Sequence, residues 1–224
     1  MDEKLFISLV SVAVGWILGQ GTALAKDWWN ARKLCGGLLV EIQDIDEQLR
    51  RVIMGHARSL QIYALNAIEY DATLPIQNMF FRQYFKDAFS NLNREQRISY
   101  QLIHASLDVL NTKMEELGQY VDDVFKENNK DQQKRRESIE YWGGKVTAIY
   151  HIAMTIRWHI EYHLKHPKRP AFDLLGPMHE SYVKFEQWLE DDIKEIIENA
   201  KKLTLDDFKK IYDEKHFEKP RATS

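Results

Sequence analysis

One stretch near the start of the chain constrains the fold more than any other. From Leu5 to Ala25 the sequence runs for twenty-one residues without a charged side chain. As an α-helix this stretch would rise by about 1.5 Å per residue and reach roughly 30 Å, the thickness of the hydrocarbon layer of a bilayer. The sequence therefore predicts a transmembrane helix over residues 5–25, preceded by a short extracytoplasmic N-terminus, residues 1–4.

The residues that flank this stretch predict its orientation. Lys26, Arg32 and Lys33 follow it, whereas residues 1–4 carry two acids and one base. Because an excess of Lys and Arg normally stays in the cytoplasm, we expect a single-pass protein of the bacterial inner (plasma) membrane with its N-terminus outside and its bulk in the cytoplasm. A cleaved signal peptide is the alternative, since residues 23–25 have the small-x-small form of a cleavage site.

Two adjacent tryptophans, Trp28 and Trp29, stand directly after the uncharged stretch. Tryptophan is enriched where a membrane meets water, because its ring is largely apolar and its N–H group is polar. We therefore expect this pair to lie at the membrane interface, within a juxtamembrane segment that covers residues 26–37. The glycines at the end of that segment, Gly36 and Gly37, predict a break or bend.

Small residues recur every four positions within the predicted anchor, at Gly15, Gly19 and Ala23. In lipid, where no hydrophobic force drives helices together, close approach of backbones across small side chains is a main source of association. The spacing predicts that the anchor self-associates and that the protein is a homo-oligomer. The second half of the anchor is also unusually small and polar, which would suit an oligomeric pore, at Gly15, Gly19, Gln20, Gly21 and Thr22.

The rest of the chain is poor in residues that break helices. The whole sequence has five prolines and ten glycines, and three of those glycines lie in the predicted anchor. This composition favours an all-α fold. The formal net charge of -3 gives no global attraction to nucleic acid, so no nucleic-acid partner is expected.

Apolar residues recur in alternating steps of three and four along four long segments, and this spacing is typical of helices that each bury one narrow seam. Such seams can bury only against each other, so the sequence predicts an antiparallel-type bundle of about four long helices over residues 38–217, with short helices near 76–90 and after Thr204. Residues 218–224 are expected to form a disordered tail. The clearest seam positions are Leu38, Ile42, Ile45 and Leu49; Ile103, Leu107, Leu110, Met114, Leu117, Val121 and Val124; Ile139, Trp142, Val146 and Ile149; and Phe185, Leu189, Ile193 and Ile196.

Five of the eight histidines fall between residues 151 and 179. His159 and His163 are four residues apart and share a helix face, which is the spacing that a metal-binding pair on a helix uses. No compact set of cysteines or further carboxylates completes such a site. We therefore interpret the pair as helix-end histidines that interact with the helix dipole, with a metal site as the alternative and no cofactor expected.

Arg157 and His163 fit the pattern Arg-x(4–6)-His, and the residues between them read Trp-His-Ile-Glu-Tyr. This pattern, in an all-helical chain, resembles the HEPN ribonucleases. The resemblance implies a domain whose paired chains bring such residues together for RNA cleavage, with Arg157 and His163 as the catalytic residues. The other interpretation of Arg157 is an ion pair with Glu161, one turn further along the helix.

The sequence contains no phosphate-binding glycine loop, nucleophile elbow, cysteine ligand set or dinucleotide fingerprint. We therefore expect a membrane-anchored protein without evident catalytic activity, which acts by self-association and by binding an unknown protein partner as a scaffold, sensor or adaptor. The alternatives are a membrane-tethered, HEPN-like ribonuclease and an oligomeric pore that perturbs the membrane in a bacterial defence system.

Overall fold

The computed structural model of the chain describes residues 3–69, 74–127, 131–170 and 176–204, with the side chains of residues 3–10, 17 and 23 outside this description. Every regular element within these ranges is a helix, which confirms the all-α prediction. The elements are α1 (Glu3–Ala64), α2 (Met79–Ala88), the 3-10 helix η1 (Phe89–Asn91), α3 (Arg94–Glu127), α4 (Gln132–Lys165) and α5 (Pro177–Ala200).

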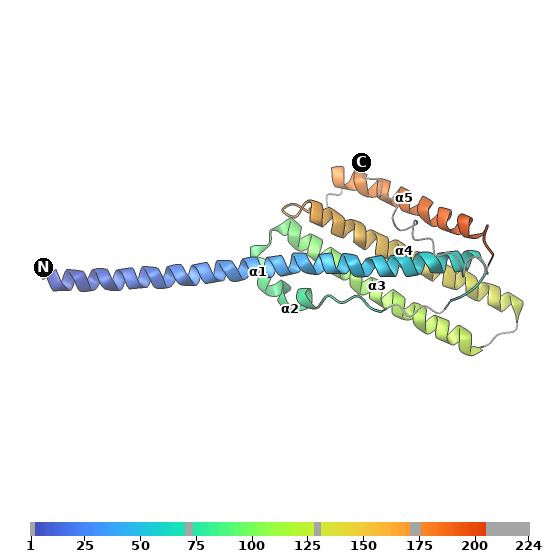
Figure 1. Cartoon of the computed structure of the whole chain (residues 1–224), viewed down its shortest axis with the longest axis horizontal. Coiled ribbons are helices and arrows are strands. Elements are labelled where there is room, and N and C mark those ends of the chain that lie inside the picture. Colours follow the sequence, from blue (N-terminus) through green and yellow to red (C-terminus); the bar gives the residue numbers. More distant parts are fainter. Residues whose placement is uncertain (1–2, 70–73, 128–130, 171–175, 205–224) are drawn as a thin grey trace.

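Helix α1 is the longest element, at 62 residues, and it belongs to two parts of the molecule. Its N-terminal part projects alone from the rest of the protein, and its C-terminal part packs inside the bundle (Figure 1). We call the projecting part, residues 3–33, the stalk. At about 1.5 Å per residue the whole helix is about 90 Å long.

The predicted break at Gly36 and Gly37 was wrong, because α1 continues through both glycines. A glycine inside a helix costs only about 1 kcal/mol relative to alanine, and the packing of neighbouring residues overcomes that cost. The ring of Phe80 from α2 packs so closely on Gly37 that a Cβ atom there would overlap it, whereas Gly36 faces open space. Gly37 is therefore a contact point for α2.

The bundle consists of the C-terminal part of α1 together with α3, α4 and α5. Helix α4 packs against α1, α3 and α5, and α2 covers α1 near the start of the bundle. Helix α4 runs antiparallel to its three long neighbours, while α1, α3 and α5 run in the same direction (Figure 1). The prediction of four long helices in a bundle is confirmed, and the parallel pair α1 and α3 arises because the chain returns along the bundle between them.

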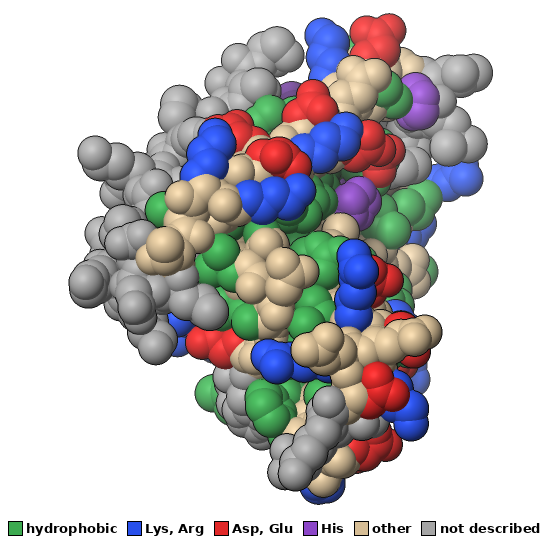
Figure 2. All heavy atoms as spheres, turned by 90° about the vertical axis from the view of Figure 1, so that its right-hand side faces the viewer, with side chains coloured by type: hydrophobic (Ala, Val, Ile, Leu, Met, Phe, Trp, Pro, Cys, Tyr) green, Lys and Arg blue, Asp and Glu red, His purple; other side chains and the backbone are tan. Residues whose placement is uncertain are grey.

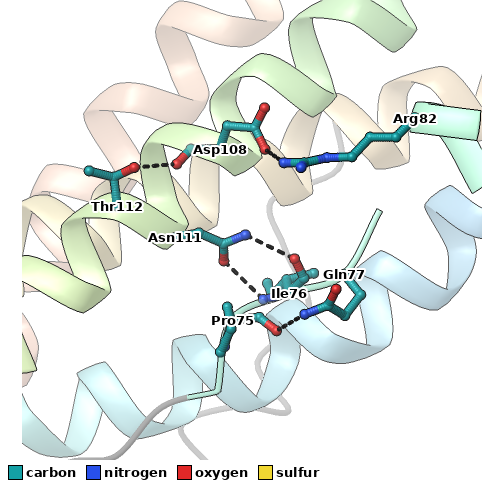
Figure 3. Close-up of polar contacts among 7 residues, drawn as sticks. All are labelled: Pro75, Ile76, Gln77, Arg82, Asp108, Asn111 and Thr112. Carbon is teal, nitrogen blue, oxygen red and sulfur yellow. Dashed lines mark hydrogen bonds and ion pairs between the residues drawn. The ribbon is translucent and has the colours of Figure 1, made fainter. Parts of the chain in front are cut away.

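That return segment is fixed by side chains of α3 (Figure 3). The Asn111 side-chain amide donates to the Ile76 carbonyl oxygen at 2.9 Å, and its oxygen accepts from the Ile76 backbone N–H, also at 2.9 Å. Asp108 forms an ion pair with Arg82 at 2.7 Å. The short helix predicted near 76–90 begins later than expected, at Met79, because Asn111 holds the backbone of Ile76 in an extended segment.

The core is built from the predicted seams. On α1 the side chains of Leu38, Ile42, Ile45 and Leu49 are all 0% exposed. Asn93 and Gln96 cap the start of α3, because each accepts a hydrogen bond from the backbone N–H of the other, at 2.8 and 2.9 Å. The predicted short helix after Thr204 and the predicted tail over 218–224 lie outside the described residues.

The end of the bundle remote from the stalk carries charges of both signs. Basic and acidic side chains are interspersed there, with hydrophobic side chains visible between them (Figure 2). Interspersed charges of this kind are typical of a water-exposed surface. The surface of the stalk is different.

Candidate functional site

The stalk carries large apolar side chains that are mostly exposed. Val12 is 70% exposed, Trp16 67%, Leu18 63% and Leu24 69%. These residues lie on several sides of the helix, at about 100° per residue, so apolar side chains surround the stalk between Val12 and Leu24. A helix that is apolar on all sides normally lies inside a large protein core or a membrane.

Within the part of the chain that the structure describes, no helix is both long and apolar enough to cross a membrane. The side chains of residues 5–10, 17 and 23 of the predicted anchor lie outside the described residues. The backbone of 5–25 is helical throughout. The helical conformation predicted for 5–25 is confirmed, whereas its prediction as a membrane-spanning helix finds no support among the described residues.

The face of the stalk that carries Gly15 and Gly19, which we call the small face, is open. A Cβ atom built at Gly15 or at Gly19 would meet no other atom within 4 Å. The hydroxyl of Thr22 donates to the carbonyl oxygen of Gly19 at 2.9 Å, so this polar side chain is satisfied within its own helix. The side chain of the third predicted residue, Ala23, lies outside the described residues.

The predicted interface tryptophans stand on the stalk just before the bundle begins. Trp28 is 60% and Trp29 is 65% exposed. The guanidinium carbon of Arg32 lies 5.4 Å from the centre of the Trp28 ring, which is a cation–π contact. Among the described residues, Trp29, Arg32 and Lys33 line an open surface hollow of about 640 Å³. The structure thus places aromatic rings and cations together where the stalk meets the bundle.

Inside the bundle, Glu41 of α1 fastens α2. Its two carboxylate oxygens accept hydrogen bonds from the backbone N–H groups of Phe80 at 2.6 Å and Phe81 at 2.8 Å. These N–H groups belong to the first turn of α2 and have no partner within that helix, so Glu41 acts as an N-terminal cap supplied by another helix. Burial raises the pKa of the Glu41 carboxyl, and the two backbone hydrogen bonds oppose this rise.

His104 lies beside this cap. Its ring stacks on Phe81 with centroids 3.7 Å apart, and its side chain is only 2% exposed. Its Nε2 atom lies 3.8 Å from Glu41, beyond hydrogen-bond distance, and neither ring nitrogen has a hydrogen-bond partner among the described residues. Burial lowers the pKa of His104 to about 4, so the ring is neutral at pH 7 and the contact with Glu41 is not an ion pair there.

The two residues of the ribonuclease pattern take different partners. The Arg157 Nε atom lies 3.1 Å from Asp46 of α1, and its Nη2 atom lies 3.9 Å from Glu161, which confirms the predicted ion pair along the helix. His163 Nδ1 is 2.8 Å from the hydroxyl of Ser99 on α3, and the side chain is 1% exposed. Within one chain the structure does not bring Arg157 and His163 together.

The two histidines of the alternative metal site are also directed to different neighbours. The His159 ring stacks on Tyr182 of α5, with centroids 5.6 Å apart, while His163 is bonded to Ser99 of α3. Among the described residues, no group of three or more His, Cys, Asp or Glu side chains is arranged to hold a metal ion. Burial lowers the pKa of both histidines to about 4, so both rings are neutral at pH 7.

Sequence reasoning missed the cap formed by Glu41 and the pair of hydrogen bonds between the Asn111 side chain and the backbone of Ile76. Each of these residues stands directly beside a seam residue, Ile42 and Leu110, and hydrophobic periodicity gives no information on its partner. The partners lie 39 and 35 positions away in the chain. No local signal could have found them.

Comparison with protein-family models, with curated proteins and with solved structures gives no match to this chain.

Proposed function

We propose that this protein is a single-pass membrane protein whose stalk anchors a cytoplasmic helical bundle, and that it acts by self-association and by binding other proteins. The observation that carries the proposal is the stalk itself: Trp16, Leu18 and Leu24 are each more than 60% exposed on a continuous helix. Exposed in water, such side chains would lose about 1.5–3 kcal/mol each of the free energy that burial supplies. The uncharged sequence from Leu5 to Ala25 makes lipid the environment that suits the stalk best.

Self-association through the stalk is supported by the open space at Gly15 and Gly19. A second copy of the helix could approach this face closely and form van der Waals contacts and weak Cα–H···O contacts along the backbone. Gly21 lies about 200° around the helix from Gly19, on the opposite side. It is also open, with no atom within 4 Å of a Cβ atom built there, so it provides a matched control.

A binding role for the bundle is supported by the way its polar groups are used. Glu41 caps α2, Arg157 pairs with Asp46, and His163 bonds to Ser99. Each of these contacts joins two helices. The buried polar groups therefore fix the shape of the bundle, as a surface that recognises another protein requires.

The test compares the full-length protein with a protein that begins at Lys26. The full-length protein should float with phosphatidylcholine vesicles and should show the mass of a defined oligomer in nanodiscs, whereas the truncated protein should do neither. Gly19→Ile should reduce the mass to that of a monomer, and Gly21→Ile should leave the oligomer intact. Failure of the full-length protein to float would refute the anchor, and an unchanged oligomer in Gly19→Ile would refute the small face.

A further inference from the structure

The cations that follow the anchor share one face of α1. At about 100° per residue, Lys26, Arg32 and Lys33 all lie within about 60° of Trp29 around the helix axis. All four side chains are exposed. Asp27, the one acid among these residues, lies about 160° from Trp29, on the opposite side. The face centred on Trp29, which we call the basic face, therefore carries three positive charges and no negative charge.

The bundle leaves the basic face uncovered. Leu38, nine residues after Trp29, points in about the opposite direction around the helix, and it is 0% exposed in the core. The side of α1 that meets the other helices is therefore the side away from the basic face. Neither Arg32 nor Lys33 forms an ion pair with any carboxylate of the described residues.

The position of the basic face along the helix matches the headgroup layer. With residues 5–25 in the hydrocarbon, Lys26 lies at its edge, and Lys33 lies about 10 Å further along the axis. The headgroup region is roughly 5–8 Å thick on each side of a bilayer. Because side chains of a helix lean toward its N-terminus, the long chains of Arg32 and Lys33 lean back toward the membrane and can reach the phosphates.

We propose that the basic face binds the phosphate of an anionic phospholipid, with Arg32 and Lys33 as the anion-binding residues and Trp29 against the lipid glycerol. This inference rests on the proposed anchor, and it adds a lipid class to it. Arg32 is steadied by its cation–π contact with Trp28, at 5.4 Å from the ring centre.

The preference for an anionic lipid follows from charge. Phosphatidylcholine also has a phosphate, but its choline group carries a positive charge that the three cations repel, whereas phosphatidylglycerol has no such group. The far end of the bundle, by contrast, has charges of both signs interspersed, and a headgroup would meet repulsion there as well as attraction (Figure 2).

The experiment is a competition between two lipids for the full-length protein in detergent, measured by native mass spectrometry. Phosphatidylglycerol and phosphatidylcholine with identical acyl chains are added in equal amounts, so the headgroup is the one difference. The wild-type protein should bind phosphatidylglycerol in preference by about threefold or more, since each cation at a membrane surface attracts anionic lipid by a factor of this order. Arg32→Gln/Lys33→Gln should reduce this preference to near one.

The matched control is Lys134→Gln/Arg135→Gln, which removes the same charge from exposed positions in the first turn of α4 and should keep the wild-type preference. Equal binding of the two lipids by the wild type, or an unchanged preference in Arg32→Gln/Lys33→Gln, would overturn the proposal.

Inorganic phosphate at millimolar concentration should not displace the lipid. If it does, the face binds free phosphate and the lipid assignment is wrong. The proposed anchor is tested separately: it would be refuted if the full-length protein did not float with phosphatidylcholine vesicles. Loss of the lipid preference in the competition would refute only the role of the basic face.

Discussion

The two parts of helix α1 have similar residues and opposite surroundings. Leu18 and Leu24 on the stalk are 63% and 69% exposed, whereas Leu38 and Leu49 in the bundle are 0% exposed. The backbone is the same unbroken helix in both places. The difference teaches that the helix continues whether or not its side chains are buried by the protein, so the environment of each part has to be inferred from its side chains.

Side-chain patterning separates the two parts. In the bundle part, apolar residues fall on one seam and the other positions are largely polar, which is the pattern of a helix packed against protein on one side and water on the other. In the stalk, apolar residues occur on all sides, and no charge occurs between Leu5 and Ala25. The predictions below test this contrast, from the largest expected effect to the smallest.

Acidification should unfold the bundle and leave the stalk helical. Burial lowers the pKa of His104, His159 and His163 to about 4, from an ordinary value of 6.5. The unfolded chain binds protons on these histidines at a higher pH than the folded chain does. The stability that the neutral rings contribute is therefore fully present above pH 6.5 and is lost as the pH falls toward 4. The loss is at most about 3 kcal/mol per histidine. Near-ultraviolet circular dichroism and urea midpoints of the protein in nanodiscs between pH 7 and 4 would measure it.

The stalk carries no titratable side chain from Leu5 to Ala25, so its association with vesicles should not change over the same pH range. His179→Gln, at an exposed position on α5, is the control and should leave the pH profile unchanged. A bundle equally stable at pH 7 and pH 4.5 would contradict the burial of three neutral imidazole rings.

Truncation of one apolar side chain in each part should have very different effects. Ile45 is 0% exposed, and Ile45→Ala should destabilise the bundle by about 2–5 kcal/mol, since it removes buried contacts and leaves a cavity. Leu18→Ala should change the free energy of unfolding of the bundle by less than about 0.5 kcal/mol, because Leu18 has no contact with it. Urea unfolding followed by near-ultraviolet circular dichroism would measure both, and equal losses would show that the stalk packs on the bundle.

Removal of the Glu41 carboxylate should loosen α2. Glu41→Ala leaves the backbone N–H groups of Phe80 and Phe81 without their acceptors and should cost about 1–3 kcal/mol. Glu47→Ala is the matched control six residues further along α1, because the Glu47 side chain is 70% exposed and should contribute almost nothing. Hydrogen exchange at the Phe80 and Phe81 amides should become faster in Glu41→Ala alone, and unchanged exchange would rule out the cap.

Alanine at two adjacent glycines should have effects of opposite sign where the stalk joins the bundle. Gly36→Ala should stabilise the protein by about 0.5–1 kcal/mol, because alanine favours the helix and the position is open. Gly37→Ala should destabilise it by about 1–3 kcal/mol, because the new methyl group would overlap the Phe80 ring. Thermal unfolding midpoints of the two variants would show the signs, and stabilisation by both would mean that Phe80 does not press on α1.

The sequence predicted the parts of this fold that depend on local periodicity. The seam of α3, from Ile103 to Val121, is buried as predicted, because a helix of this length can hide only the residues that share its inner face. The contacts between helices were not predictable, because they depend on which seams meet. Gly37 illustrates this limit: in sequence it suggests a break, and in the structure it is a contact with α2.

The same limit applies to the candidate site. The uncharged run, the small residues and Trp28 with Trp29 are local features and were identified from the sequence. Arg157 and His163 matched a pattern in sequence, but spacing along one helix does not reveal that one side chain turns to α1 and the other to α3. A contact of that kind is decided by the neighbouring helices.

The unbroken backbone of α1 also determines how the bundle moves relative to a bilayer. From Ala25 to Leu38 the helix spans about 20 Å, and a continuous helix of this length bends little. A flexible linker of thirteen residues would have a similar root-mean-square span, about 20 Å, but in every direction. With the proposed anchor, the bundle is held at one height and one rotational angle, so a turn of the helix within the membrane would swing the whole bundle by the same angle.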